Sequence, residues 1–166
     1  MTGSDRGRIA PVPQWRCQPL AALPAVMLYR ALALRSSVFV VEQACIYQDA
    51  DGSDLEALLV IGSLPGDGVG DGEVVATARV LPPGSRYAEA SIGRVCTSAR
   101  HRGQGLGRML MAVAIDATRA HHPRQAVRIS AQAYLEGFYR SFGFEPVLPQ
   151  YLEDGIPHLE MRLPPG

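Results

Sequence analysis

The chain has 166 residues, the length of a single domain, and 47% of them are hydrophobic, which is enough for a real core. Its formal net charge of zero gives no support to a nucleic-acid partner, and its apolar runs are too short to cross a membrane. All 16 basic residues are arginine, so a Schiff-base lysine and a Walker-type lysine are both excluded.

The cysteines and the N-terminal segment indicate the compartment. Cys17, Cys45 and Cys96 are odd in number and widely spaced, which argues against a disulfide framework and against a zinc site. Residues 1–14 are polar and proline-rich and lack the apolar stretch of a signal peptide. We therefore expect a loose tail over 1–14, one domain over 15–166, a cytoplasmic location and no metal.

The charges are segregated along the chain. Between Arg35 and Arg79 there is no basic residue, and the acids there are Glu42, Asp49, Asp51, Asp54, Glu56, Asp67, Asp71 and Glu73. Between Glu89 and Asp116 there is no acid, and the bases are Arg94, Arg100, His101, Arg102 and Arg108. Two interpretations stay open: two solvated faces, or one subsite for a cation and one for an anion.

The first half of the chain predicts a helix followed by an antiparallel meander. Residues 15–19 read as a first strand, and residues 24–37 as a helix with Leu28, Leu32 and Arg35 at helical spacing. Val38 to Val41 is a short apolar segment leading into the acidic loop. Three strands are expected next, at 55–63, 72–81 and 87–97, with a Gly- and Asp-rich hairpin loop over 62–72.

The second half predicts two helices and three strands. Apolar residues follow the helical period from Leu106 to Ala117, and Pro123 ends this helix. A strand is expected at 126–131 and a short helix at 134–142, with Gly143 as its C-cap. Strands at 144–148 and 158–163 form a final pair around the loop 149–157. The sum is an α+β fold with a mixed, mostly antiparallel sheet.

The segment between the strand ending at Thr97 and the helix starting at Leu106 predicts an anion site. Its three glycines, Gly103, Gly105 and Gly107, allow a tight turn that exposes backbone N–H groups. The unpaired amides and positive dipole end of the following helix point to the same place. Arg102 and Arg108 add charge-assisted contacts to an anion held there.

Other phosphate-binding patterns fit this loop poorly. The Walker pattern is absent, and the dinucleotide pattern GxGxxG would need a glycine where Arg108 stands. The dinucleotide fold also starts from a parallel βαβ unit, whereas this loop follows a meander. A nucleotide-dependent enzyme is therefore disfavoured.

The pattern Arg102-x-x-Gly105-x-Gly107 resembles the acetyl-CoA signature of the GNAT N-acetyltransferase superfamily. The resemblance implies the GNAT (acyl-CoA N-acyltransferase) fold, with a six- or seven-stranded sheet flanked by helices. It also implies that the strand before the loop splays away from its neighbour and pairs with the pantetheine arm. The implied cofactor-binding residues are Val95, Cys96, Thr97, Arg102, Gly103, Gln104, Gly105, Leu106, Gly107 and Arg108.

A second motif, Phe138-Tyr139-Arg140-Ser141-Phe142-Gly143-Phe144, resembles the FYxxxGF element of the same superfamily. By this resemblance Tyr139 is the general acid that protonates the departing CoA thiolate. The reaction implied is direct attack of a primary amine on acetyl-CoA in a ternary complex. Attack needs a neutral amine, so a base must accept a proton, and the candidates are Glu42, His158 and the acids of the acidic loop.

The two base candidates have different strengths, and the choice between them stays open. Glu42 follows the apolar residues 38–41, so we expect it to be partly buried and more basic than usual. The intrinsic pKa of histidine suits His158 to the task, although a histidine at the start of a strand fits equally well.

Within the superfamily the chain resembles the ElaA-type proteins through its segments 34–54 and 151–158. The resemblance spans residues 15–163 but does not supply the acceptor, which the acidic loop suggests is small and cationic. In this fold the acceptor cleft should hold Glu42, Tyr47, Gln132, Glu153, Asp154 and His158. A non-catalytic acyl-CoA-binding module is the alternative to an enzyme, and apolar sheet edges are compatible with a homodimer.

Overall fold

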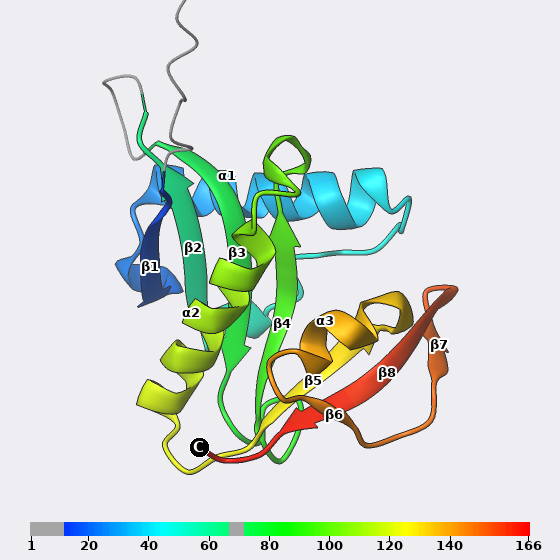
Figure 1. Cartoon of the computed structure of the whole chain (residues 1–166). Helices are drawn as coiled ribbons and strands as arrows, with labels where there is room; N and C mark the ends of the chain where they lie inside the picture. Colours follow the sequence, from blue (N-terminus) through cyan, green and yellow to red (C-terminus); the bar gives the residue numbers. More distant parts are fainter. Residues whose placement is uncertain (1–11, 67–71) are drawn as a thin grey trace, which may run out of the picture.

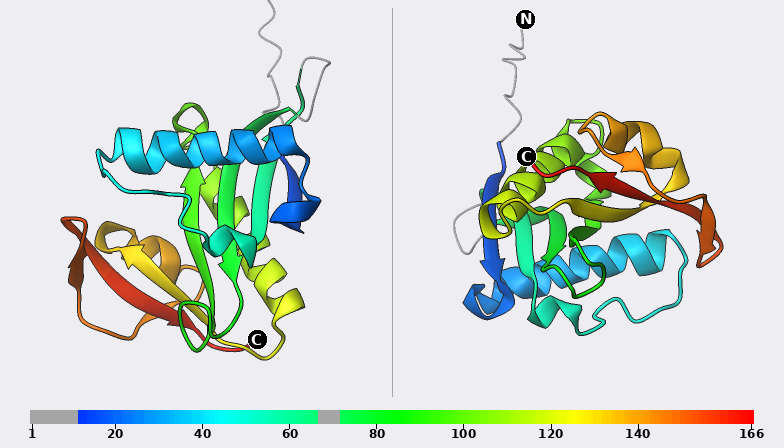
Figure 2. Two further views of the ribbon diagram at one scale, coloured as in Figure 1. Left: turned by 180° about the vertical axis from the view of Figure 1, so that it is seen from behind. Right: turned by 90° about the horizontal axis from the view of Figure 1, so that it is seen from below.

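Within residues 12–66 and 72–166, which are those that the structure describes, a mixed sheet of eight strands carries helices on both faces (Figures 1 and 2). The coordinates are a computed structural model. The strands are β1 (Gln14–Pro19), β2 (Leu58–Leu64), β3 (Glu73–Leu81), β4 (Ala90–Thr97), β5 (Val127–Gln132), β6 (Glu145–Pro146), β7 (Tyr151–Glu153) and β8 (Ile156–Leu163). The helices are α1 (Ala25–Arg35), the π-helix η2 (Ser36–Glu42), α2 (Leu106–His121) and α3 (Glu136–Arg140).

The strand order is β1-β2-β3-β4-β5-β8-β6, and β7 pairs with β8. Every described pair is antiparallel except β4 and β5, which run parallel. None of the helices in the described ranges is long and apolar enough to span a membrane.

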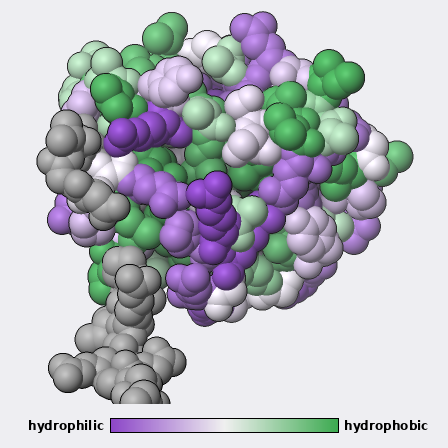
Figure 3. All heavy atoms as spheres, turned by 90° about the horizontal axis from the view of Figure 1, so that it is seen from above, coloured by the Kyte–Doolittle hydropathy of each residue, from purple (hydrophilic) through white to green (hydrophobic). Residues whose placement is uncertain are grey.

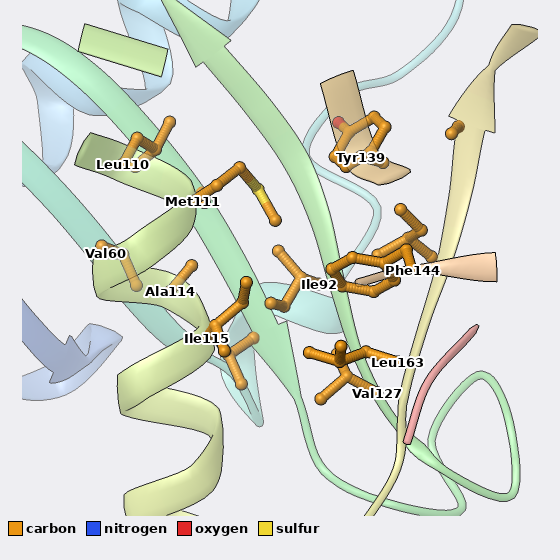
Figure 4. Packing of buried hydrophobic residues seen from close by; sticks show 14 of the residues in the cluster. Val60, Ile92, Leu110, Met111, Ala114, Ile115, Val127, Tyr139, Phe144 and Leu163 are labelled. Carbon is orange, nitrogen blue, oxygen red and sulfur yellow. The ribbon is translucent and has the colours of Figure 1, made fainter. Parts of the chain in front are cut away.

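Each face of the sheet has its own apolar core. On one face α2 buries Leu110, Met111 and Ala114 against β2, β3 and β4, and the short helix α3 adds Tyr139 (Figure 4). On the other face α1 buries Met27 and Ala31 against the opposite side of β2 and β3. Figure 2 shows α1 on one side of the sheet and α2 and α3 on the other.

The strands β4 and β5 meet at one end and then separate. Their ladder joins Ala90 to Val127 and Ser91 to Arg128, and no later pairing follows. A bulge in β4 accompanies the separation: the register against β3 shifts between Thr77 and Arg79, and Arg94 adopts a φ of +50°. The splayed strand that the sequence motif implies is therefore confirmed.

A largely buried network of three arginines and three aspartates ties α1 and the acidic loop to the strands. We call Arg35, Asp49, Asp51, Asp54, Arg79 and Arg94 the arginine–aspartate network. Arg35 is 1% exposed; its Nε donates to Asp49 at 2.8 Å and its Nη1 to Asp54 at 2.7 Å. Arg79 donates to both carboxylate oxygens of Asp51, at 2.7 and 3.0 Å, and Nε of Arg94 lies 2.7 Å from Asp49. The charges of the network cancel, as burial requires.

The pKa of Asp51 follows from these contacts. Partial burial acts to raise it, but hydrogen bonds from Arg79 and from the backbone amide of Ser53 outweigh the burial and hold the pKa well below its usual range. The carboxylate therefore stays ionised, and the stability it contributes is present at neutral pH and is lost when acid protonates it.

The order of helices and strands agrees with the sequence-based prediction, but several bounds differ: the strand expected at 144–148 covers only Glu145–Pro146, and the strand expected from residue 55 begins at Leu58. The apolar segment Val38–Val41 continues α1 as a π-helix instead of leaving it, and the loop 149–157 contains β7, which raises the strand number to eight. Residues 1–11 of the predicted tail and 67–71 of the predicted hairpin loop, with Asp67 and Asp71, lie outside the described residues. Gln14, assigned to the tail, already belongs to β1.

Substitution of Arg35 tests the network. Arg35→Leu would leave Asp49 and Asp54 buried with fewer compensating charges, so we expect the free energy of unfolding to fall by about 3–5 kcal/mol. Urea denaturation with linear extrapolation measures it. The control is Arg140→Leu, which removes an exposed pair with Glu136 and should cost less than about 0.5 kcal/mol. Equal losses in the two variants would contradict a structural role for the network.

Candidate active site

A cleft of about 740 Å³ lies where β4 and β5 diverge, and it is lined by residues from both faces of the sheet. Leu106 and Tyr139 line it from the side of α2 and α3, and Val38 and Glu42 from the side of α1. Along β5, Ile129 and Ala131 are buried in the α2 core, so the alternating residues Ser130 and Gln132 face the opposite side. The cleft therefore passes through the sheet.

The structure brings nearly all of the predicted site residues to this one cleft. Those that line it are Glu42, Tyr47, Val95, Cys96, Thr97, Arg102, Gly103, Gly105, Leu106, Gly107, Arg108, Gln132, Tyr139, Glu153, Asp154 and His158. Gln104 belongs to the same loop but does not line the cleft. Sequence reasoning missed other lining residues, among them Arg86, Tyr87, Ser130 and Phe138.

The loop before α2 has the geometry of an anion site. Gly103 and Gly105 have φ of +78° and +77°, the left-handed region where glycine is unstrained, and the space beyond both α-carbons is open. Gly105 is the N-cap of α2, and its carbonyl accepts the amides of Arg108 and Met109. The first amides of the helix therefore remain available, and the dipole of α2 adds positive potential there.

The two arginines of the loop differ in their partners. Arg102 donates to both carboxylate oxygens of Glu42, at 2.6 and 2.9 Å, so its charge is already compensated. Arg108 has no carboxylate partner among the described residues; its guanidinium donates to Ser141 at 3.0 Å and stacks 5.1 Å from the ring centroid of Phe142. The free positive charge at the anion site is therefore that of Arg108.

Tyr139 is buried beside the cleft on α3. Its ring packs edge-to-face with Phe138 and Phe144, and Figure 4 shows its hydroxyl oxygen on the side away from Phe144. Burial raises its pKa to about 12, so the phenol is neutral at physiological pH and is a hydrogen-bond donor.

Cys96 is a packed thiol. It lies on β4 with 6% of its surface exposed, and burial raises its pKa to about 12. A neutral, buried thiol is a poor nucleophile, because the thiolate is the reactive form.

The two candidate bases differ in their surroundings. The hydrogen bond from Arg102 lowers the pKa of Glu42, whose side chain is 43% exposed, so the expectation that this residue is buried and more basic is wrong. The ring of His158 has Nδ1 2.8 Å from the carbonyl of Ile156. A carbonyl can only accept, so Nδ1 carries the proton and Nε2 is the proton-accepting nitrogen.

The acidic loop is not a cation subsite. Asp49, Asp51 and Asp54, which suggested one, are the carboxylates of the arginine–aspartate network and have arginine partners. Tyr47, in the same loop, donates to Asp49 at 3.2 Å, and burial is the main reason that its pKa rises to about 12. The structural argument for a cationic acceptor drawn from this loop therefore fails.

Comparison with known proteins identifies the family. The model of the acetyltransferase (GNAT) domain matches residues 70–164. A UPF0039 protein of Synechocystis is 41% identical over 154 residues, covering 92% of this chain and 97% of its own length. Protein ElaA of Escherichia coli is 41% identical over 153 residues, covering 89% and 94%. The chain belongs to the GNAT acetyltransferase family.

Solved structures agree with this assignment. A crystal structure described as an acyl-CoA N-acyltransferase from Pseudomonas aeruginosa has a TM-score of 0.81 and 41% identity, covering 91% of this chain and 99% of its own. Escherichia coli ElaA gives a TM-score of 0.81 and 39% identity with the same coverage. The predicted GNAT fold and the likeness to ElaA are therefore confirmed.

The loop of this GNAT protein suits the diphosphate of an acyl-CoA. The available amides, the N-terminus of α2 and the uncompensated Arg108 supply donors and positive charge, and the two left-handed glycines leave space for an anion to approach. Arg102 offers less charge to such an anion than the sequence suggested, because Glu42 holds its guanidinium.

A negative charge introduced at position 105 tests the assignment of this loop as the diphosphate site. Gly105→Asp places a carboxylate at the anion site, and we expect the Kd of CoA to rise tenfold or more, measured by isothermal titration calorimetry. Gly105→Ala is the uncharged control: alanine meets nothing within 4 Å and tolerates the left-handed φ less well than aspartate, so the effect of strain on the Kd is at least as large in it. An equal Kd in the Asp and Ala variants would exclude this loop as the diphosphate site.

Proposed function

We propose that this protein is an acetyl-CoA-dependent N-acetyltransferase that acts on the primary amine of a small acceptor. The observation that carries the proposal is the cleft through the sheet, which joins the anion site before α2 to Tyr139 and to a polar wall on the far face. The Pseudomonas relative described as an acyl-CoA N-acyltransferase supports the same reaction class. A polar wall beyond Tyr139 suits a second substrate, which a module that merely binds acyl-CoA would not need.

Each substrate would be held by different residues. Acetyl-CoA supplies the activated acetyl group, and the amides before α2 together with Arg108 would bind its diphosphate. Because β4 loses its ladder to β5 after Ser91, the backbone of Val95 to Thr97 is free to pair with the pantetheine arm. The acceptor amine would approach from the face of Ser130 and Gln132.

The reaction is direct attack in a ternary complex. The N–C bond forms while the C–S bond breaks, and the departing sulfur receives a hydrogen bond and then a proton from Tyr139. With the pKa of Tyr139 at about 12, full transfer to a thiolate of pKa about 8.5 is uphill by roughly 5 kcal/mol. The hydrogen bond is therefore the main contribution of Tyr139, and the proton released by the amine restores the phenol.

His158 is the base that this geometry favours. Its Nε2 is the proton-accepting nitrogen and its side chain lines the cleft. An amine of pKa about 10.4 is almost wholly protonated at neutral pH, a handicap of roughly 4.6 kcal/mol, so proton acceptance contributes substantially to the rate. Glu42 is a weaker base, because Arg102 occupies both of its oxygens.

Removal of the Tyr139 hydroxyl separates catalysis from binding. Tyr139→Phe should lower kcat about 100-fold while the Kd of CoA stays within about twofold, because the ring packing is kept and the donor is lost. Thiol release and calorimetry measure the two quantities. Tyr29→Phe, on an exposed residue outside the cleft, is the control. If CoA binding collapsed together with kcat, Tyr139 would be structural.

Turnover of two variants distinguishes the base candidates. His158→Gln should lower kcat about 100-fold, because the proton-accepting nitrogen in the cleft is lost. Glu42→Gln should leave kcat nearly unchanged, because Arg102 already occupies both oxygens of Glu42. A large loss in Glu42→Gln with normal turnover in His158→Gln would reverse the assignment.

A further inference from the structure

Arg86 and Glu153 form an open ion pair on the far wall of the cleft. Nη2 of Arg86 lies 3.7 Å from Oε1 of Glu153, too far for a hydrogen bond. By contrast, Arg102 donates to both oxygens of Glu42 at 2.6 and 2.9 Å, the usual geometry of a charge-assisted pair. Arg86 and Glu153 therefore keep donors and an acceptor for a ligand.

Neighbouring side chains fix the positions of both Arg86 and Glu153. The hydroxyl of Ser130 donates to Oε2 of Glu153 at 3.1 Å and accepts from the hydroxyl of Tyr151 at 2.5 Å. The guanidinium of Arg86 stacks 5.4 Å from the ring centroid of Tyr87. The two side chains remain 43% and 40% exposed, and both line the cleft, so fixed and opposite charges are presented to whatever binds there.

Two other arginines that line the cleft are compensated. Arg79 and Arg94 line the same cleft but belong to the arginine–aspartate network, with Asp51 and Asp49 as partners. A ligand at the wall therefore meets the accessible guanidinium of Arg86 beside the carboxylate of Glu153, and Asp154, the next residue, adds a second carboxylate that has no arginine partner among the described residues. A simple monocation would be attracted by Glu153 and repelled by Arg86, whereas a molecule with adjacent opposite charges satisfies both.

We propose that the acceptor is an α-amino acid, whose ammonium group is recognised by Glu153 and whose carboxylate is recognised by Arg86. This inference rests on the proposed function and names the substrate class of the same site. The base is close by: the ring of Tyr151, whose hydroxyl supports Glu153 through Ser130, lies 6.1 Å from the ring of His158. The amine bound at Glu153 therefore has a proton acceptor on the neighbouring strand, β8, to which β7 is paired.

Matched acceptors test the role of the carboxylate. Each protein amino acid with a primary α-amine is assayed with acetyl-CoA beside its carboxamide and its decarboxylated amine. For the preferred side chain, kcat/KM of the free amino acid should exceed that of the carboxamide at least tenfold, because a charge-assisted contact is lost with the carboxylate.

Two variants assign the recognition to residues. Arg86→Gln should raise the KM of the amino acid about 10- to 100-fold, leave that of the carboxamide unchanged and so abolish the discrimination. Glu153→Gln should raise the KM of both compounds by similar factors, because both carry the ammonium. Arg16→Gln, on an exposed residue of the distant strand β1, is the charge-matched control and should change neither.

Equal or better turnover of the carboxamides or decarboxylated amines would overturn the inference and leave the proposed function intact. So would acetylation confined to amines without an α-carboxylate. If nothing is acetylated, saturation-transfer NMR on the CoA complex decides between the two ideas. Binding of the amino acid in preference to its amide, lost in Arg86→Gln, would uphold the acceptor class and reject the enzyme; absent or unselective binding would reject the acceptor class too.

Discussion

The cleft depends on the separation of β4 from β5, and this separation is stabilised by buried charges. Arg94 stands in the bulge of β4 with a φ of +50°, a conformation that costs a non-glycine residue about 1–2 kcal/mol. Its contacts with Asp49 and Asp51 offset that cost, and Arg35 and Arg79 supply the remaining positive charge. The acidic loop, α1 and two strands are thereby fixed around the point where the sheet opens.

The arginines fall into two groups according to their partners. Arg35, Arg79 and Arg102 are joined to carboxylates by short hydrogen bonds, so their charges are used within the protein. Arg86 and Arg108 stack on aromatic rings and have no hydrogen-bonded carboxylate among the described residues. These two lie at different parts of the cleft, Arg86 on the far wall beside Glu153 and Arg108 at the anion loop.

Figure 3 shows hydrophilic residues interspersed with hydrophobic ones over the end of the molecule seen from above.

Features that are set by residues close together in the sequence could be predicted from it. The loop 102–108 and the helix after it follow from glycine spacing and apolar periodicity, and both were placed correctly. The burial of Arg35 had a local signal, because this charged residue occupies the apolar side of α1. No local signal in the sequence indicated the partners of the network's aspartates: Asp51 pairs with Arg79 and Arg94, which are 28 and 43 residues away. Arg86 was missed for the same reason, since the loop after β3 meets β7 only in the folded chain.

The passage of the cleft through the sheet also bears on the length of the acyl group. The CoA loop and Tyr139 lie toward one face, while Ser130, Glu153 and His158 lie toward the other. If acetyl-CoA binds as proposed, each methylene added to its acyl group would extend into the room that the acceptor needs. Long-chain donors and bulky acceptors would therefore exclude one another, and the shared volume of about 740 Å³ sets the combined size of the two.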